Sequence, residues 1–140
     1  NNAQALIMAA AVADFAPVQT ELEKIKKDKN LSEIKLKPTK DILKEINALK
    51  EKHHLDIKKI GFAAESQNLK ENAVKKLQEK GLDMIVANDI TKPEAGFSVD
   101  TNQVLMIFSN GSFEQLPLMS KSDVADKIIQ HVATWLIGGA

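Results

Sequence analysis

The sequence predicts an α/β fold in which a mostly parallel sheet lies between two layers of helices. Three apolar runs, at residues 5–12, 59–65 and 83–89, have the length of buried strands, and each ends in polar residues. Two stretches with helical periodicity, residues 40–52 and 69–80, separate these runs. Strands that alternate with helices in this way are typical of a parallel sheet.

The composition fits one compact domain over residues 1–140, because 44% of the chain is apolar and 27% is charged. The 19 lysines are balanced by 19 acidic residues, so neither nucleic acid nor an anionic membrane is indicated as a partner. The absence of cysteine excludes disulfides, zinc–thiolate sites and a thiol nucleophile. No apolar run reaches the ~20 residues of a membrane span. A reducing cytosol is compatible with the absence of cysteine, and we expect a cytoplasmic protein.

The first strand is expected to end beside a ligand site. A run of small residues at 9–13 leads into Asp14, and Phe15, Ala16 and Pro17 are expected to start a loop. In open α/β sheets, ligands bind at the carboxyl ends of the strands, where Asp14 would stand. An aspartate that caps a helix or closes a turn is the competing interpretation.

A lysine-rich β-hairpin is expected to protrude from the sheet. Residues 33–37 alternate with period two, which predicts a strand with one polar face, and residues 24–26 are its expected partner. Clustered ammonium groups suit phosphates. An edge hairpin that lysine protects from aggregation is the simpler interpretation.

Two helices carry further candidate residues. Thr39 is the expected N-cap of the first helix, and the amides at its start could receive an anion. Asn68 and Glu71 loosely match a capping box at the start of the second. Lys76 and Lys80 are four residues apart and share a helix face, which usually means a solvated surface.

The last third of the chain predicts an antiparallel edge and a final helix. Residues 104–108 form an apolar run, Asn110-Gly111 is a strong hairpin signal, and residues 113–118 are expected to return as a strand. Ser122 is the expected cap of the last helix. Its expected buried face comprises Val124, Ile128, Ile129, Val132 and Leu136.

Taken together, these segments resemble the C-terminal part of phosphopantothenoylcysteine synthetase. The matching segments, in the family's order, are residues 9–15, 23–27, 40–43, 61–65, 87–89, 96–97 and 100–102. The resemblance implies a Rossmann-like three-layer fold whose N-terminal portion is missing from this chain. The family's glycine-rich Ser-Ser-Gly segment and its asparagine have no counterpart here, so we expect this chain alone to be inactive or severely impaired.

The resemblance also implies a reaction and its partners. The family joins 4′-phosphopantothenate to L-cysteine in coenzyme A biosynthesis. Bacterial members use CTP and a divalent metal, Mg²⁺, through an acyl-cytidylate intermediate. The family is dimeric, which implies a homodimer with the lysine hairpin as a contact.

A set of site residues carries over from the resemblance. Lys24 is implied as the catalytic contact to phosphate, and Lys40 stands where the family has a proline. The implied nucleotide-binding residues are Ala10, Asp14, Lys24, Lys40, Asp41, Ile42, Leu43, Phe62, Lys76 and Lys80. The metal ligands remain open.

Two other functions compete with the ligase. A non-catalytic interaction module would use the lysine hairpin to bind a second subunit or an acidic partner. A nicotinamide-dependent Rossmann enzyme is disfavoured, because neither GxGxxG nor GxxxxGK[ST] occurs in the sequence.

Overall fold

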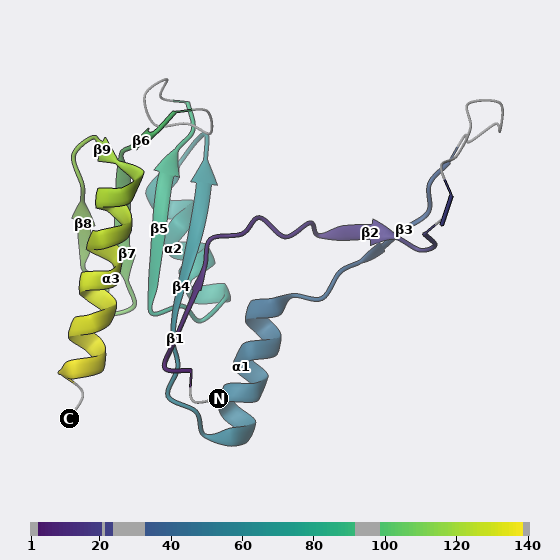
Figure 1. Ribbon diagram of the computed structural model, residues 1–140, viewed down its shortest axis with the longest axis horizontal. Coiled ribbons are helices and arrows are strands. Elements are labelled where there is room, and N and C mark those ends of the chain that lie inside the picture. The colour runs from purple at the N-terminus through teal and green to yellow at the C-terminus, as the bar shows by residue number, and fades with distance from the viewer. Residues whose placement is uncertain (1–2, 21, 24–32, 92–98, 139–140) are drawn as a thin grey trace.

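The computed structural model describes residues 3–20, 22–23, 33–91 and 99–138. A five-stranded sheet forms the centre of the molecule, and helices cover both of its faces (Figure 1). Its strands are β1 (Ala5–Met8), β4 (Lys58–Glu65), β5 (Met84–Asp89), β7 (Val104–Phe108) and β8 (Phe113–Gln115). The first three are parallel, and β7 and β8 continue the sheet as an antiparallel edge. The predicted α/β fold is therefore confirmed.

The alternation of side chains along the strands divides the core into two clusters. On one face, Met84 and Val86 of β5 pack with residues of helix α3 (Lys121–Ile137). On the other face, Ile85 and Ala87 pack with helix α2 (Leu69–Glu79). Helix α1 (Ile42–His53) joins the second face through Leu43, and none of its residues is fully buried. This arrangement gives three layers.

The predicted N-cap of α1 is wrong, whereas Asn68 occupies the predicted N-cap position of α2 without the side-chain bond of a capping box. Asp41 caps α1, because its carboxylate accepts from the Lys44 amide at 3.3 Å, whereas the Thr39 hydroxyl donates to the Ala13 carbonyl at 2.5 Å. Asn68 precedes α2 in a left-handed conformation with φ 48° and makes no side-chain cap bond. Capping through a side chain requires extended backbone, which the left-handed residue lacks.

The last helix also departs from the prediction. Ser120 caps it, with its hydroxyl accepting from the Asp123 amide at 3.0 Å, so the helix begins before Ser122. Val124, Ile128 and Val132 are buried as expected. Ile129 and Leu136 were wrongly assigned to the buried face, since Ile129 is 53% exposed and Leu136 is 39% exposed.

A two-stranded arm extends away from the sheet (Figure 1). It pairs β2 (Phe15–Pro17) with β3 (Leu36–Pro38) in antiparallel register, with Ala16 opposite Lys37. The expected loop at residues 15–17 is therefore a strand, and the partner of the lysine-rich segment is β2. Pro17 and Pro38 are tolerated here because β2 and β3 are both edge strands. The amide that each proline lacks is not needed for pairing within a larger sheet. The expected partner at residues 24–26 lies outside the described residues.

Several strand limits also differ from expectation. Strand β1 ends at Met8 instead of residue 12, and the small residues that follow leave the sheet. Strand β8 ends at Gln115, short of residue 118. A second small ladder, absent from the prediction, joins β6 (Thr101–Asn102) to β9 (Met119–Ser120). Gly111 adopts φ 86° in the β7–β8 turn, as the Asn110-Gly111 signal predicts.

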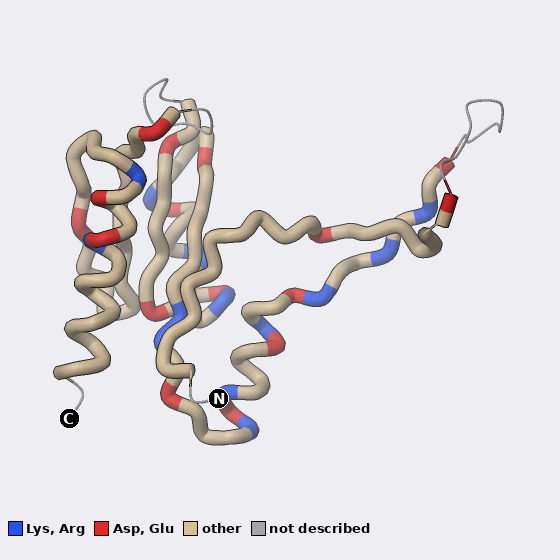
Figure 2. Tube along the Cα trace, in the orientation of Figure 1, with Lys and Arg blue, Asp and Glu red and all other residues tan. Residues whose placement is uncertain are grey.

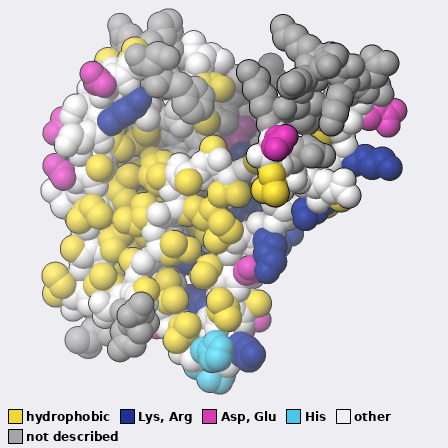
Figure 3. Space-filling view, turned by 45° about the vertical axis from the view of Figure 1, so that its right-hand side comes forward, with side chains coloured by type: hydrophobic (Ala, Val, Ile, Leu, Met, Phe, Trp, Pro, Cys, Tyr) yellow, Lys and Arg dark blue, Asp and Glu magenta, His cyan; other side chains and the backbone are white. Residues whose placement is uncertain are grey.

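Lysine and apolar side chains are unevenly distributed over the parts of the molecule in view. Lysine segments follow β3 into the first turns of α1 (Figure 2). Apolar side chains gather over a broad face in the space-filling view, and lysine side chains lie along its right-hand side (Figure 3). Ile7 of β1 and Phe62 of β4 are among the large apolar side chains that remain exposed. In the described part of the chain, no helix has both the length and the apolar character needed to cross a membrane.

Candidate functional site

A cavity of about 470 Å³ lies among the loop after β1, the start of α1, strand β4 and the second half of α2. Nine of the ten predicted site residues line it: Ala10, Asp14, Lys40, Asp41, Ile42, Leu43, Phe62, Lys76 and Lys80. The tenth, Lys24, lies outside the described residues. Segments that are up to 70 positions apart in the sequence therefore meet at one place.

The loop after β1 forms one wall of this cavity. Ala10 and Ala13 line it, and their small side chains let another group approach the backbone closely. The loop is held against the segment before α1, because Thr39 bonds to Ala13 and the Thr39 amide donates to the Asp14 carbonyl at 2.9 Å. Thr39 therefore ties the loop that carries Asp14 to the helix that follows.

An ion pair joins the start of α1 to the end of α2. The Lys80 ammonium lies 2.5 Å from the Asp41 carboxylate, and both residues line the cavity. The Lys80 hydrogen bond, aided by the Lys44 amide, holds the pKa of Asp41 below its usual value, against the opposing effect of burial. Asp41 is therefore both the cap of α1 and the partner of a cavity lysine.

A partly buried polar network contacts the backbone of Lys80. The Asn47 amide donates to the Lys80 carbonyl at 2.9 Å, and the Lys59 ammonium donates to the Asn47 side-chain oxygen. Lys59 is only 4% exposed, and desolvation, with a smaller contribution from Lys50, lowers its pKa. This network was not predicted, because it joins three elements that no local pattern connects.

A second acid–lysine pair lies at the carboxyl end of β4. The Lys76 ammonium donates to a Glu65 oxygen at 2.6 Å, and the Asn72 amide donates to the other oxygen at 3.1 Å. Glu65 is mostly buried, with 14% of its side chain exposed, whereas 47% of the Lys76 side chain is exposed. The two predicted helix lysines are therefore both held by carboxylates instead of being free in solvent.

The β4 residues at the cavity have different surroundings. A Cβ on Gly61 would lie 2.6 Å from a Leu82 methyl carbon, so glycine here permits close packing within the chain. Phe62 is 39% exposed. Its register opposite Val86 places its ring on the face that α3 covers.

Lys40 precedes α1 and lies on the surface. Its ammonium pairs with the Glu45 carboxylate at 3.3 Å.

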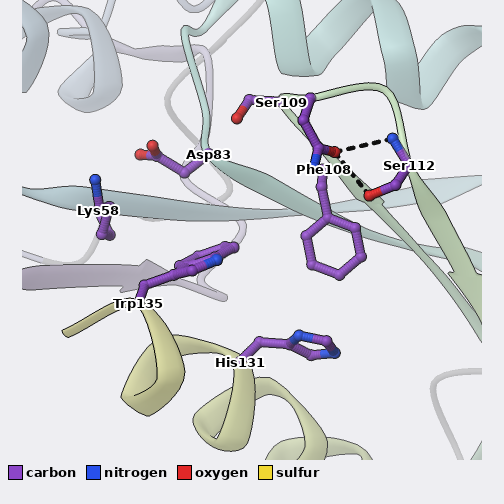
Figure 4. A pocket seen from close by; sticks show the side chains of 8 residues that line it. Lys58, Asp83, Phe108, Ser109, Ser112, His131 and Trp135 are labelled. Atoms are coloured by element: carbon purple, nitrogen blue, oxygen red, sulfur yellow. Dashed lines mark hydrogen bonds between the residues drawn. The ribbon is translucent and has the colours of Figure 1, made fainter. Parts of the chain in front are cut away.

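The amino ends of the parallel strands hold a second cavity, of about 370 Å³ (Figure 4). His131 and Trp135 project from α3 toward Phe108, whose ring centroid lies 4.9 Å and 6.1 Å from theirs. Asp83 accepts from the Lys59 amide at 2.8 Å. None of the nine predicted site residues that the structure describes lines this cavity.

The first cavity suits an anion that also carries hydroxyl groups. Two ammonium groups, from Lys76 and Lys80, can donate to phosphate oxygens, and the Asp14 carboxylate can accept from hydroxyls. No group of three potential metal ligands occurs among the described residues. The arrangement fits a nucleotide whose phosphates supply part of any metal coordination.

This fold, with such a cavity at the strand ends, belongs to a recognisable class of proteins. The chain belongs to the family described as the DNA/pantothenate metabolism flavoprotein C-terminal domain, whose model matches residues 1–136. The resemblance seen in the sequence is thereby confirmed at the level of the family.

Individual relatives agree with this family. The chain is 45% identical over 128 residues to the coenzyme A biosynthesis bifunctional protein CoaBC of Bacillus subtilis, covering 91% of the chain and 30% of that protein. It is 41% identical over 128 residues to a protein from an unknown prokaryotic organism, named cysteine/cysteine sulfinic acid decarboxylase, covering 91% of the chain and 35% of that protein. The chain thus spans about a third of these relatives.

A crystal structure of the C-terminal domain of a CoaBC protein superposes with a TM-score of 0.73 and 35% sequence identity. The match covers 98% of this chain and 57% of that one. The sequence comparisons and the structural comparison therefore agree on the fold and the family.

Proposed function

We propose that this chain carries the nucleotide-binding part of a CTP-dependent phosphopantothenate–cysteine ligase of coenzyme A biosynthesis. The observation that carries the proposal is the convergence of nine implied nucleotide-binding residues on one cavity. Family membership and the similarity to CoaBC proteins support a role in coenzyme A biosynthesis.

In the proposed first step, the carboxylate of 4′-phosphopantothenate attacks the α-phosphorus of CTP. Pyrophosphate leaves, and an acyl-cytidylate forms. The amine of L-cysteine then attacks the acyl carbon, which forms the amide and releases CMP. Such a transfer depends on positioning and charge neutralisation more than on a protein nucleophile, so the absence of cysteine from the chain is compatible with it.

The cavity residues have separable roles in this proposal. Lys76 and Lys80 bind the phosphate oxygens, and Asp14 accepts hydrogen bonds from hydroxyls of the nucleotide. The small residues around Ala10 let the nucleotide lie against the backbone. Mg²⁺, when bound, would neutralise phosphate charge, and the cavity offers Asp14 as a carboxylate toward it. Lys24 is proposed as a further, catalytic phosphate contact.

The remaining partners follow the same proposal. 4′-Phosphopantothenate and L-cysteine are the co-substrates, the cytoplasm is the location, and a homodimer is the assembly. The arm formed by β2 and β3 is the proposed dimer contact, since it extends away from the sheet (Figure 1). Sedimentation of the complete protein tests the assembly, and a monomer at high concentration would remove the arm from this role.

The decisive experiment measures pyrophosphate release by the complete protein with 4′-phosphopantothenate, cysteine and CTP. We expect Lys80→Met to raise the KM for CTP by about tenfold, because one charge-assisted contact to phosphate is lost. Lys75→Met is the matched control, because Lys75 is exposed on the same helix and pairs only weakly with Glu79, at 3.8 Å. Absence of pyrophosphate release in the complete assay, or an unchanged KM for CTP in Lys80→Met, would contradict the proposal.

Thermal shift with CTP, ATP and NAD compares the competing functions. Selective stabilisation by CTP supports the ligase, and stabilisation by NAD alone supports a nicotinamide enzyme. No shift with any of the three favours the interaction module. The similarity to a relative named as a decarboxylase makes decarboxylation a second candidate. Release of CO₂ from cysteine without nucleotide would favour that candidate.

A further inference from the structure

We infer that Glu65 is a positioning residue that holds the Lys76 ammonium in place for a nucleotide phosphate. The inference rests on the proposed function, because it takes Lys76 to be a phosphate ligand. Lys76 lines the cavity, whereas Glu65 is not among its described lining residues. Glu65 therefore acts on Lys76 from outside the space that the nucleotide would fill.

The Glu65 carboxylate is itself held on both oxygens. One oxygen accepts from Lys76 at 2.6 Å, and the other accepts from the Asn72 amide at 3.1 Å. Asn72 also donates to the Gln67 carbonyl at 3.0 Å. Asn72 and Lys76 are one helical turn apart on α2, so both project toward the end of β4. The carboxylate thus has a fixed position from which to orient the lysine.

Orientation matters here because a lysine side chain has many rotamers. An unrestrained lysine loses much of its rotamer freedom when it is immobilised. Lys76 is 47% exposed, so packing alone restrains it little. The bond to the mostly buried Glu65 removes much of this freedom before a ligand arrives, which leaves less to be lost on binding.

The pair can persist when phosphate binds. An ammonium has three donors, so one can remain on Glu65 while the others reach phosphate oxygens. The second pair of the cavity differs, because Asp41 lines the cavity together with its partner Lys80. Asp41 could therefore contact a ligand directly, whereas Glu65 acts only by positioning Lys76.

A double-mutant cycle in the complete protein tests this inference. The variants are Glu65→Gln, Glu65→Ala, Lys76→Met and the double variant Glu65→Gln/Lys76→Met. We expect Glu65→Gln to raise the KM for CTP by about fivefold, with a smaller change in kcat. The loss of one well-formed ion pair has an effect of this size. Glu65→Ala should raise it further, because glutamine still accepts from Lys76. In the Lys76→Met background, Glu65→Gln should add no further change.

Glu71→Gln is the matched control, because Glu71 is exposed in the first turn of α2 and the same charge is removed. It should leave the KM for CTP unchanged. The thermal midpoint of each variant reports its folding. Should Glu65→Ala fail to fold, Glu65→Gln carries the test, since it keeps the shape of the side chain.

Two results would overturn the inference while the proposed function stands. A KM for CTP that falls in Glu65→Gln would mean that the carboxylate competes with phosphate. Equal effects of Glu65→Gln with and without Lys76 would mean that the two residues act independently. Absence of CTP turnover in the wild-type protein would instead overturn the proposed function, and this inference with it.

Discussion

The Asp41 carboxylate lies 2.5 Å from the Lys80 ammonium, although 39 positions separate the two residues in the chain. Asp41 is also the N-cap of α1, so one side chain caps the start of a helix and joins that helix to the end of α2. The two roles can be separated by substitution, because asparagine caps helices well but cannot form the ion pair.

We therefore predict that Asp41→Ala lowers the free energy of unfolding by about 1 kcal/mol more than Asp41→Asn does, since only alanine loses the cap. Urea unfolding of the complete protein measures the difference. Asp41→Asn itself should cost little, because Asp41 and Lys80 are each about a third exposed and solvent screens the pair. Equal losses in the two variants would show that the cap contributes nothing.

The acid dependence of stability should also change in Asp41→Asn. The Lys80 hydrogen bond lowers the pKa of Asp41 below its ordinary value of 3.8. A lowered carboxyl pKa contributes stability that is fully present above the unfolded value and is lost as the pH falls through the folded value. The wild-type protein should thus lose more stability below pH 3.8 than Asp41→Asn does. Urea unfolding across that range tests this, and parallel curves would contradict it.

Lys59 should give the opposite dependence, in the alkaline range. Burial lowers its pKa from the ordinary 10.5, so the folded protein binds this proton less tightly than the unfolded chain does. Stability contributed by Lys59 therefore rises as the pH increases from its folded pKa toward 10.5. We expect the free energy of unfolding of the wild type to rise relative to that of Lys59→Met over this pH range. Lys58→Met, at an adjacent residue whose ammonium bonds to exposed Asp56, is the control. This variant keeps Lys59, so its stability should change with pH as that of the wild type does.

Gly61→Ala should destabilise the fold by about 1–3 kcal/mol, the usual cost of overpacking. The new Cβ would lie 2.6 Å from a methyl carbon of Leu82, whose side chain is buried and has little room to move. Adding Leu82→Val should recover part of the loss. If the double variant is as unstable as the sum of the two single variants, Leu82 is not the group that requires glycine.

The elements with strong local signals were predictable from the sequence. Strand β7 matches its predicted limits, and the Asn110-Gly111 turn joins it to β8 as expected. The ten site residues were implied by the family resemblance, and only the fold shows that the nine described ones line one cavity. Local patterns alone gave Lys76 and Lys80 no special role, because a lysine pair on a helix face looks the same whether or not carboxylates hold it.

Features that depend on tertiary contacts could not be predicted. Threonine is a common N-cap residue, but the Thr39 hydroxyl donates to the Ala13 carbonyl instead of capping the helix. The arm has an exposed β3 and therefore no buried face to indicate which segment pairs with it. Lys59 is polar in sequence yet buried in strand β4, because Asn47 of helix α1 supplies a hydrogen-bond partner.

The attachment of α1 has a consequence for local unfolding. None of its residues is fully buried, and directional bonds from Asp41 and Asn47 hold it to the rest of the molecule. A segment held in this way can open as a unit at a lower free energy than the whole protein. Its backbone amides should then exchange with deuterium earlier than those of β5, which lies at the centre of the sheet. A ligand that bridges α1 and α2 would slow that exchange, so the opening of one helix would record occupancy of the cavity.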